Sequence, residues 1–144
     1  MKEAEKLFSI RVPAHLDASP AEVYRAWTDP AELSQWLVEG GRCVISAVEP
    51  DGLYYLSMLY EGRHYPHYGR YLRTEPGKLL QFTWVSEGTR GHESEVTIKL
   101  APEKGGTRLE LVHSNLADEK SGESHEQGWK ELLELLEKRM AARA

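Results

Sequence analysis

The sequence predicts a single α+β domain in which one long helix covers an antiparallel sheet. Its 144 residues suit one domain with its own core. Short segments of alternating polarity, separated by glycine and proline turns, predict consecutive antiparallel strands, because such short connections join hairpin neighbours. The last part of the chain instead has apolar residues at helical spacing, which predicts a long amphipathic helix. The helix and the sheet each have an apolar face that the other can cover.

The first elements are a strand and two short helices. Phe8–Leu16 alternates in polarity, which predicts a strand with Pro13 at an edge or a bulge. The motif SPAEVYRAW, which begins at Ser19, supplies a serine N-cap, a proline at the first helical position and a glutamate that completes a capping box. The motif DPAELSQWL, which begins at Asp29, repeats this arrangement with an aspartate cap. Two short helices should therefore follow the first strand.

Six further strand-like segments follow, separated by turn signals such as Pro76-Gly77, which fits a type II turn. They are Arg42–Val48, Leu53–Tyr60, His67–Arg73, Leu79–Ser86, Glu93–Leu100 and Thr107–Ser114. With the first strand they predict a sheet of about seven strands. A polar loop is expected over Asn115–Gly122, before a C-terminal helix over Ser124–Met140.

The late strands place one apolar face of the sheet against the final helix. This face contains Leu80, Phe82, Trp84, Val96, Ile98, Leu100, Leu109, Leu111 and His113. The helix carries an apolar stripe that begins at Trp129 and ends at Met140. Because Gly128 has no side chain, we expect either a gap or a tightly docked segment beside the helix backbone there, walled by the ring of Trp129.

Composition limits the classes of partner. The net charge is −5 and no basic stripe is present, so we expect no nucleic-acid partner. Cys43 is the one cysteine, which excludes an intramolecular disulfide and a cysteine-based zinc site, and it suits a small buried position. The N-terminus is charged where a secretory signal is apolar, and no apolar run approaches the roughly 20 residues that span a membrane. We therefore expect a cytoplasmic protein with no membrane partner.

Five segments, taken in order, resemble a known family. They are VYRAWTDPAELSQW, PDG, GRYLRTEPGKLLQFTW, GGTRLELVHS and HEQGWKELLELL. Together they resemble the activator of heat-shock protein 90 ATPase homologue-like family, which belongs to the START-like, or SRPBCC, superfamily with the helix-grip (Bet v allergen-like) fold. The resemblance covers about Phe8 to Met140. It implies one domain over residues 1–144, with a core of about 8–140, in which a curved antiparallel sheet grips the C-terminal helix and leaves a cavity between them.

The resemblance also implies a ligand-binding function, because the superfamily includes lipid carriers, hormone receptors and polyketide cyclases. We expect a small, largely apolar or aromatic ligand in the cavity. The side chains expected near or in this cavity are Trp36, Phe82, Trp84, His113, Trp129 and Leu133. The alternative is that the same residues form a solid core, with His113 as a hydrogen-bonded core histidine.

The segment around Pro66 contains an H-x-x-H pair, but the proline disfavours the helix that would give this spacing a metal-binding meaning. We therefore expect no metal and no cofactor. A loop is expected here instead, and its exposed rings could cover the cavity as a lid. The lid residues would be His64, Tyr65, His67 and Tyr68.

Other functions and states stay open. A polyketide-cyclase- or hydrolase-like enzyme would use His113 or a tyrosine as acid or base across the same cavity. A co-chaperone or another protein-interaction module is the third hypothesis. We expect a binding protein rather than an enzyme, since the sequence contains no nucleophile elbow, phosphate loop or dinucleotide fingerprint. Leu53–Tyr60 is apolar on both faces, which fits either a homodimer interface or a central strand with scattered exposed tyrosines.

Overall fold

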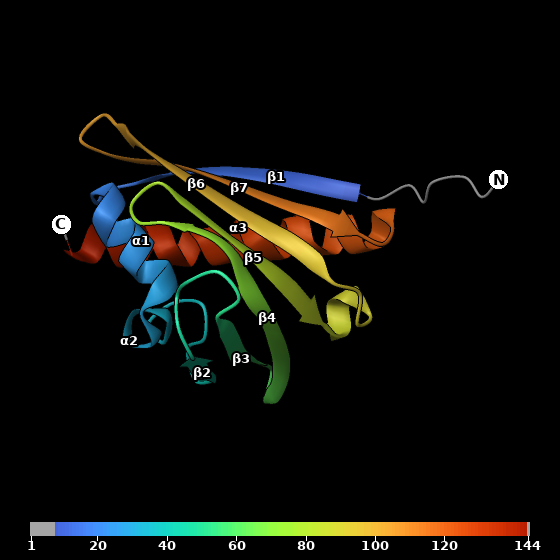
Figure 1. Ribbon diagram of the computed structural model, residues 1–144. Helices are drawn as coiled ribbons and strands as arrows, with labels where there is room; N and C mark the ends of the chain where they lie inside the picture. Colours follow the sequence, from blue (N-terminus) through green and yellow to red (C-terminus); the bar gives the residue numbers. More distant parts are fainter. Residues whose placement is uncertain (1–7, 144) are drawn as a thin grey trace.

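The computed structural model describes residues 8–143 and shows a curved sheet wrapped over a long C-terminal helix (Figure 1). The sheet has seven antiparallel strands in these residues, in the order β1-β7-β6-β5-β4-β3-β2. Every strand from β2 to β7 lies next to its neighbour in sequence, and β1 joins the sheet beside β7. The fold class predicted from the sequence is confirmed.

The bounds of the elements are as follows. The strands are β1 (Phe8–Leu16), β2 (Arg42–Ile45), β3 (Leu53–Tyr60), β4 (Arg63–Glu75), β5 (Leu79–Ser86), β6 (Ser94–Glu103) and β7 (Gly106–Leu116). The helices are α1 (Pro20–Thr28), α2 (Pro30–Leu33) and α3 (Glu119–Arg143), and a short 3₁₀ turn, η1 (Glu87–Thr89), follows β5. Within residues 8–143, no helix combines the length and the apolar character needed to cross a bilayer.

The two short helices begin where the sequence predicts. The Oγ atom of Ser19 accepts a hydrogen bond from the Glu22 amide at 3.2 Å, and Asp29 accepts one from the Ala31 amide at 3.0 Å. Each cap thus satisfies an amide that the first helical turn leaves free.

The segment expected as a loop around Pro66 is part of β4, a strand of 13 residues. The proline is tolerated because β4 pairs only with β3 at that point, while the pairing with β5 begins at His67. A missing amide at such an edge position interrupts no ladder on the other side. The loop prediction was therefore wrong.

Helix α3 also begins earlier than expected, so the predicted polar loop over Asn115–Gly122 shrinks to a short turn. Asp118 caps the helix, accepting a hydrogen bond from the Ser121 amide at 2.8 Å. An ion pair with Arg90 holds the same carboxylate. An aspartate followed by polar residues is an N-cap signal that the sequence prediction missed.

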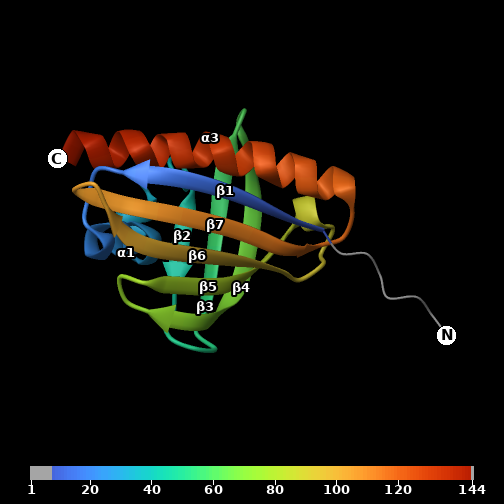
Figure 2. The same ribbon diagram turned by 90° about the horizontal axis from the view of Figure 1, so that it is seen from above.

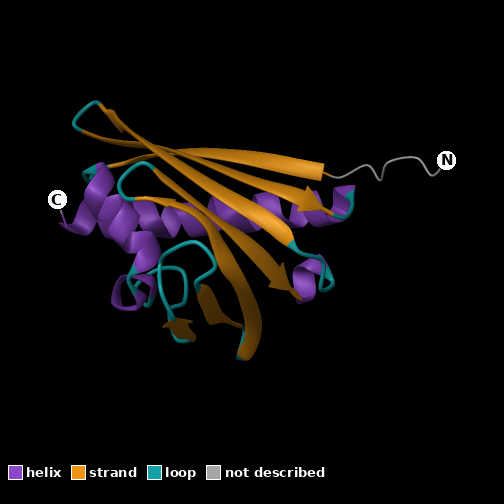
Figure 3. Ribbon diagram, in the orientation of Figure 1, coloured by secondary structure: helices purple, strands orange, loops and turns teal. Residues whose placement is uncertain are grey.

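The helices lie on the concave side of the sheet (Figure 3), and the buried apolar side chains form the core there. Helix α3 runs mainly along β1 (Figure 2). Its residues Leu133, Leu136 and Met140 are buried and belong to the same core as the apolar face of the late strands. Helix α1 contributes Trp27, whose ring lies 6.0 Å from that of Trp129. The apolar face predicted from alternation is confirmed.

The convex side has an exposed apolar row on its far strands. Val44 of β2, Tyr55 of β3 and Tyr68 of β4 are directly opposite one another in register, and all three are exposed. The alternate β3 residues Tyr54 and Leu56 are buried on the concave side. Strand β3 is thus apolar on both faces, and the homodimer remains a prediction.

The close packing around Gly69 requires a glycine at this position of β4. Gly69 lies opposite Tyr54 of β3, and the Tyr54 hydroxyl reaches across to donate to the Thr83 carbonyl of β5 at 2.5 Å. A Cβ at Gly69 would overlap that carbonyl oxygen. The tyrosine ring covers the position that the glycine leaves without a side chain.

Gly69→Ala should lower the free energy of unfolding by about 1–3 kcal/mol, because the added methyl group overpacks this position. Gly128→Ala is the matched control. A Cβ there meets no atom within 4 Å, and alanine favours a helix over glycine by about 0.5–1 kcal/mol, so this variant should gain stability. Urea unfolding of both variants measures the two effects. An unchanged urea midpoint for Gly69→Ala would contradict the close approach of the Thr83 carbonyl to Gly69.

Candidate ligand-binding cleft

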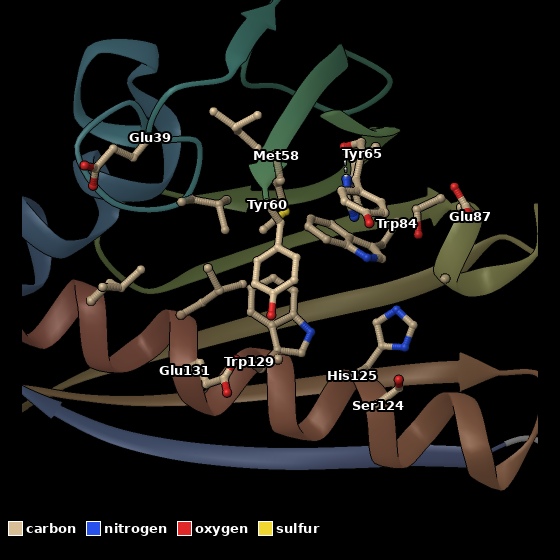
Figure 4. A pocket seen from close by; sticks show the side chains of 18 of the residues that line it. Glu39, Met58, Tyr60, Tyr65, Trp84, Glu87, Ser124, His125, Trp129 and Glu131 are labelled. Atoms are coloured by element: carbon tan, nitrogen blue, oxygen red, sulfur yellow. Dashed lines mark hydrogen bonds between the residues drawn. The ribbon is translucent and has the colours of Figure 1, made fainter. Parts of the chain in front are cut away.

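A cleft of about 720 Å³ opens between the part of α3 from Ser124 to Leu135 and the strands β3, β4 and β5 (Figure 4). The helix side is formed by Ser124, His125, Gly128, Trp129, Glu131, Leu132 and Leu135. The remaining lining residues are Trp36, Leu37, Glu39, Met58, Leu59, Tyr60, Tyr65, His67, Trp84, Ser86, Glu87 and Gly88. The volume falls within the range of about 300–1,000 Å³ that is common for small-molecule sites.

The structure brings together half of the cavity residues named from the sequence. Trp36, Trp84 and Trp129 line the cleft. Phe82 borders a second, much smaller cavity of about 20 Å³. His113 and Leu133 are buried and do not line the cleft.

Of the four residues expected to form a lid, two line the cleft and two do not. Tyr65 and His67 line the cleft, whereas His64 and Tyr68 do not. Alternation along β4 explains this result, because every second side chain faces the concave side. The segment expected to be a lid is therefore part of strand β4, which forms one wall of the cleft.

A hydrogen-bonded chain fixes the indole of Trp129. Its Nε1 donates to His113 Nδ1 at 2.9 Å. Since an indole nitrogen only donates, the imidazole proton is on Nε2, which donates to Ser94 Oγ at 2.7 Å. The Ser94 hydroxyl in turn donates to the Trp84 carbonyl at 2.6 Å. This chain links α3 through β7 and β6 to β5.

His113 is therefore a neutral core histidine. Burial, reinforced by the nearby His125, lowers its pKa to about 3. Both ring nitrogens are engaged, and the residue is fully buried. No free nitrogen remains for a ligand.

Two other histidines face the cleft. His67 Nδ1 donates to the Tyr65 carbonyl at 2.8 Å, and His125 Nδ1 donates to the Ser121 carbonyl at 2.7 Å. A carbonyl only accepts, so each neutral ring carries its proton on Nδ1 and a lone pair on Nε2. Burial lowers the pKa of His67 to about 4 and lowers the pKa of His125 as well.

His125 was not among the residues named from the sequence. It precedes Trp129 by four positions and follows Ser121 by four, so all three share one face of α3. Helical spacing could have identified it, but the helix was expected to begin at Ser124, too late to include the serine whose carbonyl holds the ring.

The cleft is acidic at its rim. Glu39, Glu87 and Glu131 are lining residues, and the described lining contains no lysine or arginine. Arg63 lies nearby, where it pairs with Glu87 at 2.6 Å and stacks over the Tyr65 ring at 4.7 Å. One of the three carboxylates is thus compensated by a neighbouring cation.

At Gly128 the structure shows a gap, one of the two arrangements expected from the sequence. No segment of residues 8–143 docks against the helix backbone there, because a Cβ at this position would meet no atom of a neighbouring segment within 4 Å. The glycine instead borders the cleft, next to Trp129. Its missing side chain leaves space in the cleft.

The described residues contain no group of three or more side chains placed to hold a metal ion. Cys43 lies outside the cleft lining, and burial raises the pKa of its thiol to about 11. The cleft therefore offers aromatic surface, imidazole acceptors and carboxylates to a bound molecule.

A curved antiparallel sheet that grips a C-terminal helix, with an apolar cleft between them, defines the helix-grip class of START-like, or SRPBCC, proteins. Residues 17–141 match the family model described as Activator of Hsp90 ATPase homolog 1-like protein, and the chain belongs to this family. Proteins with this fold commonly bind hydrophobic ligands.

Solved structures support the assignment. Protein CV1439 from Chromobacterium violaceum is 30% identical, and the match covers 92% of this chain and 96% of that one with a TM-score of 0.80. CalU16 from Micromonospora echinospora is also 30% identical, with 89% and 73% of the two chains covered and a TM-score of 0.70. A protein from Rhodobacter sphaeroides is 25% identical over 93% of each chain, with a TM-score of 0.76. Comparison with curated proteins gives no match.

The buried imidazole of His113 should make stability depend on pH. Its folded pKa of about 3 lies below the ordinary value of about 6.5, so below that value the unfolded chain takes up the proton first. The free energy of unfolding should therefore fall as the pH decreases from about 6.5 towards 4, with at most about 1.4 kcal/mol per pH unit from this group.

Denaturant unfolding across this pH range measures the slope for the parent and for His113→Leu. The variant should be less stable near neutrality, since Trp129 loses its acceptor, but its slope should be shallower. His15→Leu, at an exposed histidine of β1, serves as the control. Identical slopes for the parent and His113→Leu would show that His113 does not titrate as the structure indicates.

Proposed function

We propose that this protein binds a small, largely apolar or aromatic molecule in the cleft between α3 and the sheet. The main support for this proposal is the cleft itself, which is large enough for such a molecule and is lined by Trp36, Trp84 and Trp129. Aromatic faces give a ligand both apolar contact and ring stacking. The common use of this fold for hydrophobic ligands supports the proposal.

The titratable groups favour binding over acid–base catalysis. A general acid or base works best when its pKa is near the operating pH. The pKa of His67 is lowered to about 4, which makes this imidazole a weak base, and His113 has both nitrogens engaged away from the cleft. An enzyme using these histidines would thus depend on groups whose pKa or hydrogen bonding does not suit proton transfer near neutral pH.

Substitution at Gly128 tests the site. Gly128→Leu places a side chain in the open space of the cleft and should weaken binding of the neutral fluorescent probe N-phenyl-1-naphthylamine by about tenfold or more. The free energy of unfolding should not fall, because nothing is displaced and leucine is the better helix former. Fluorescence titration and urea unfolding give the two readouts.

Glu134→Leu is the matched control, because Glu134 is an exposed α3 residue outside the cleft lining. It should leave the affinity for the probe unchanged. If Gly128→Leu binds the probe as tightly as the parent does, the probe occupies another site and the proposed function fails. Native mass spectrometry of freshly purified protein would then report any retained ligand, and the subunit count with it.

A further inference from the structure

We infer that the cleft selects uncharged aromatic molecules that carry a hydroxyl group, and that His67 and His125 accept the hydrogen bond from this hydroxyl. This inference rests on the proposed ligand-binding function and names the class of ligand. We call these two residues the imidazole pair. They come from opposite walls of the cleft, His67 from β4 and His125 from α3.

The imidazole pair presents acceptors rather than donors. Each Nδ1 proton is already bonded to a backbone carbonyl, at 2.8 Å for His67 and 2.7 Å for His125. Within residues 8–143, neither Nε2 atom has a hydrogen-bond partner. Figure 4 shows the ring of His125 projecting from α3 towards Trp84. A ligand must therefore donate a proton to satisfy either ring.

The charges of the lining disfavour anionic ligands. Three lining residues are glutamates, and only Glu87 has an arginine beside it. A ligand carboxylate would meet further carboxylates at the rim and imidazole lone pairs within, with no cationic side chain in the described lining to pair with it. A buried charge without a partner is strongly disfavoured.

The indole of Trp84 favours a ligand donor that can also accept, as a hydroxyl does. This ring is 3% exposed, and its Nε1 proton has no acceptor among the described residues. The atom is sealed from water in this structure, so a ligand atom reaches it only when a neighbouring side chain moves. A hydroxyl oxygen can accept from this indole while its own proton is donated to an imidazole.

Three probes with one ring system separate these properties: 2-naphthol, 2-methoxynaphthalene and 2-naphthoic acid. Near neutral pH the first two are uncharged and the third is an anion. Isothermal titration calorimetry should show 2-naphthol binding about tenfold tighter than 2-methoxynaphthalene, as expected for one hydrogen bond to an acceptor that the bound ligand shields from water. 2-Naphthoic acid should bind more weakly than either.

Variants of the imidazole pair test its role. His67→Phe and His125→Phe keep an aromatic ring but remove the acceptor, so each should reduce the preference for 2-naphthol over 2-methoxynaphthalene, and the double variant should abolish it. His125→Gln retains an acceptor near the Nε2 position and should preserve part of the preference. His15→Phe, which makes the same change at an exposed site on β1, should preserve all of it.

The outcomes separate this inference from the proposed function. Equal affinities for the two neutral probes, both displacing N-phenyl-1-naphthylamine, would overturn the inference and leave the binding function in place. A preference that survives in the double variant would overturn the role of the imidazole pair. Tightest binding by 2-naphthoic acid would overturn the charge argument. Failure of all three probes to bind the parent would overturn this inference, and failure of N-phenyl-1-naphthylamine to bind as well would overturn the proposed function.

Discussion

The hydrogen-bonded chain from Trp129 through His113 and Ser94 to the Trp84 carbonyl is the constraint on which the site depends. It is buried throughout, so breaking one link leaves a polar group without solvent or partner, at about 1–3 kcal/mol. The chain ties α3 to three strands and sets how closely the helix approaches the sheet. Because Trp129 and Trp84 also line the cleft, the interaction that holds the helix in place gives the cleft its rigid aromatic wall.

Helix α3 lines the cleft from Ser124 to Leu135, and two of its positions there carry little or no side chain. Beyond this part of the helix, Leu136 and Met140 are fully buried against the sheet and fill the space beneath the helix. Within it, Ser124 and Gly128 occupy lining positions with little volume. Aromatic packing supports the cleft wall, with the rings of Trp84 and Trp129 5.0 Å apart. A helix with large apolar residues along its whole length would close the cleft.

Much of the fold follows from local patterns, whereas the site depends on distances that those patterns do not contain. Alternation predicts which face of β6 is buried, and the caps at Ser19 and Asp29 predict where the short helices begin. Parity gives the face of a side chain but not the separation between that face and the helix, which depends on the curvature of the whole sheet. For this reason the sequence left open whether Gly128 borders a gap or a docked segment, and Pro66 suggested a loop but lies where β4 has one neighbour.

One buried and two half-buried imidazoles show how one residue type serves two purposes in this protein. Burial lowers the pKa of His67, His113 and His125, so all three are neutral near pH 7. Their charge therefore cannot distinguish them, but their hydrogen bonds do. His113 uses both nitrogens within the protein and so belongs to the framework, whereas the other two use only Nδ1 and keep an acceptor facing the cleft. In this fold, whether the second ring nitrogen is already bonded separates a histidine that builds the site from one that can hold a ligand.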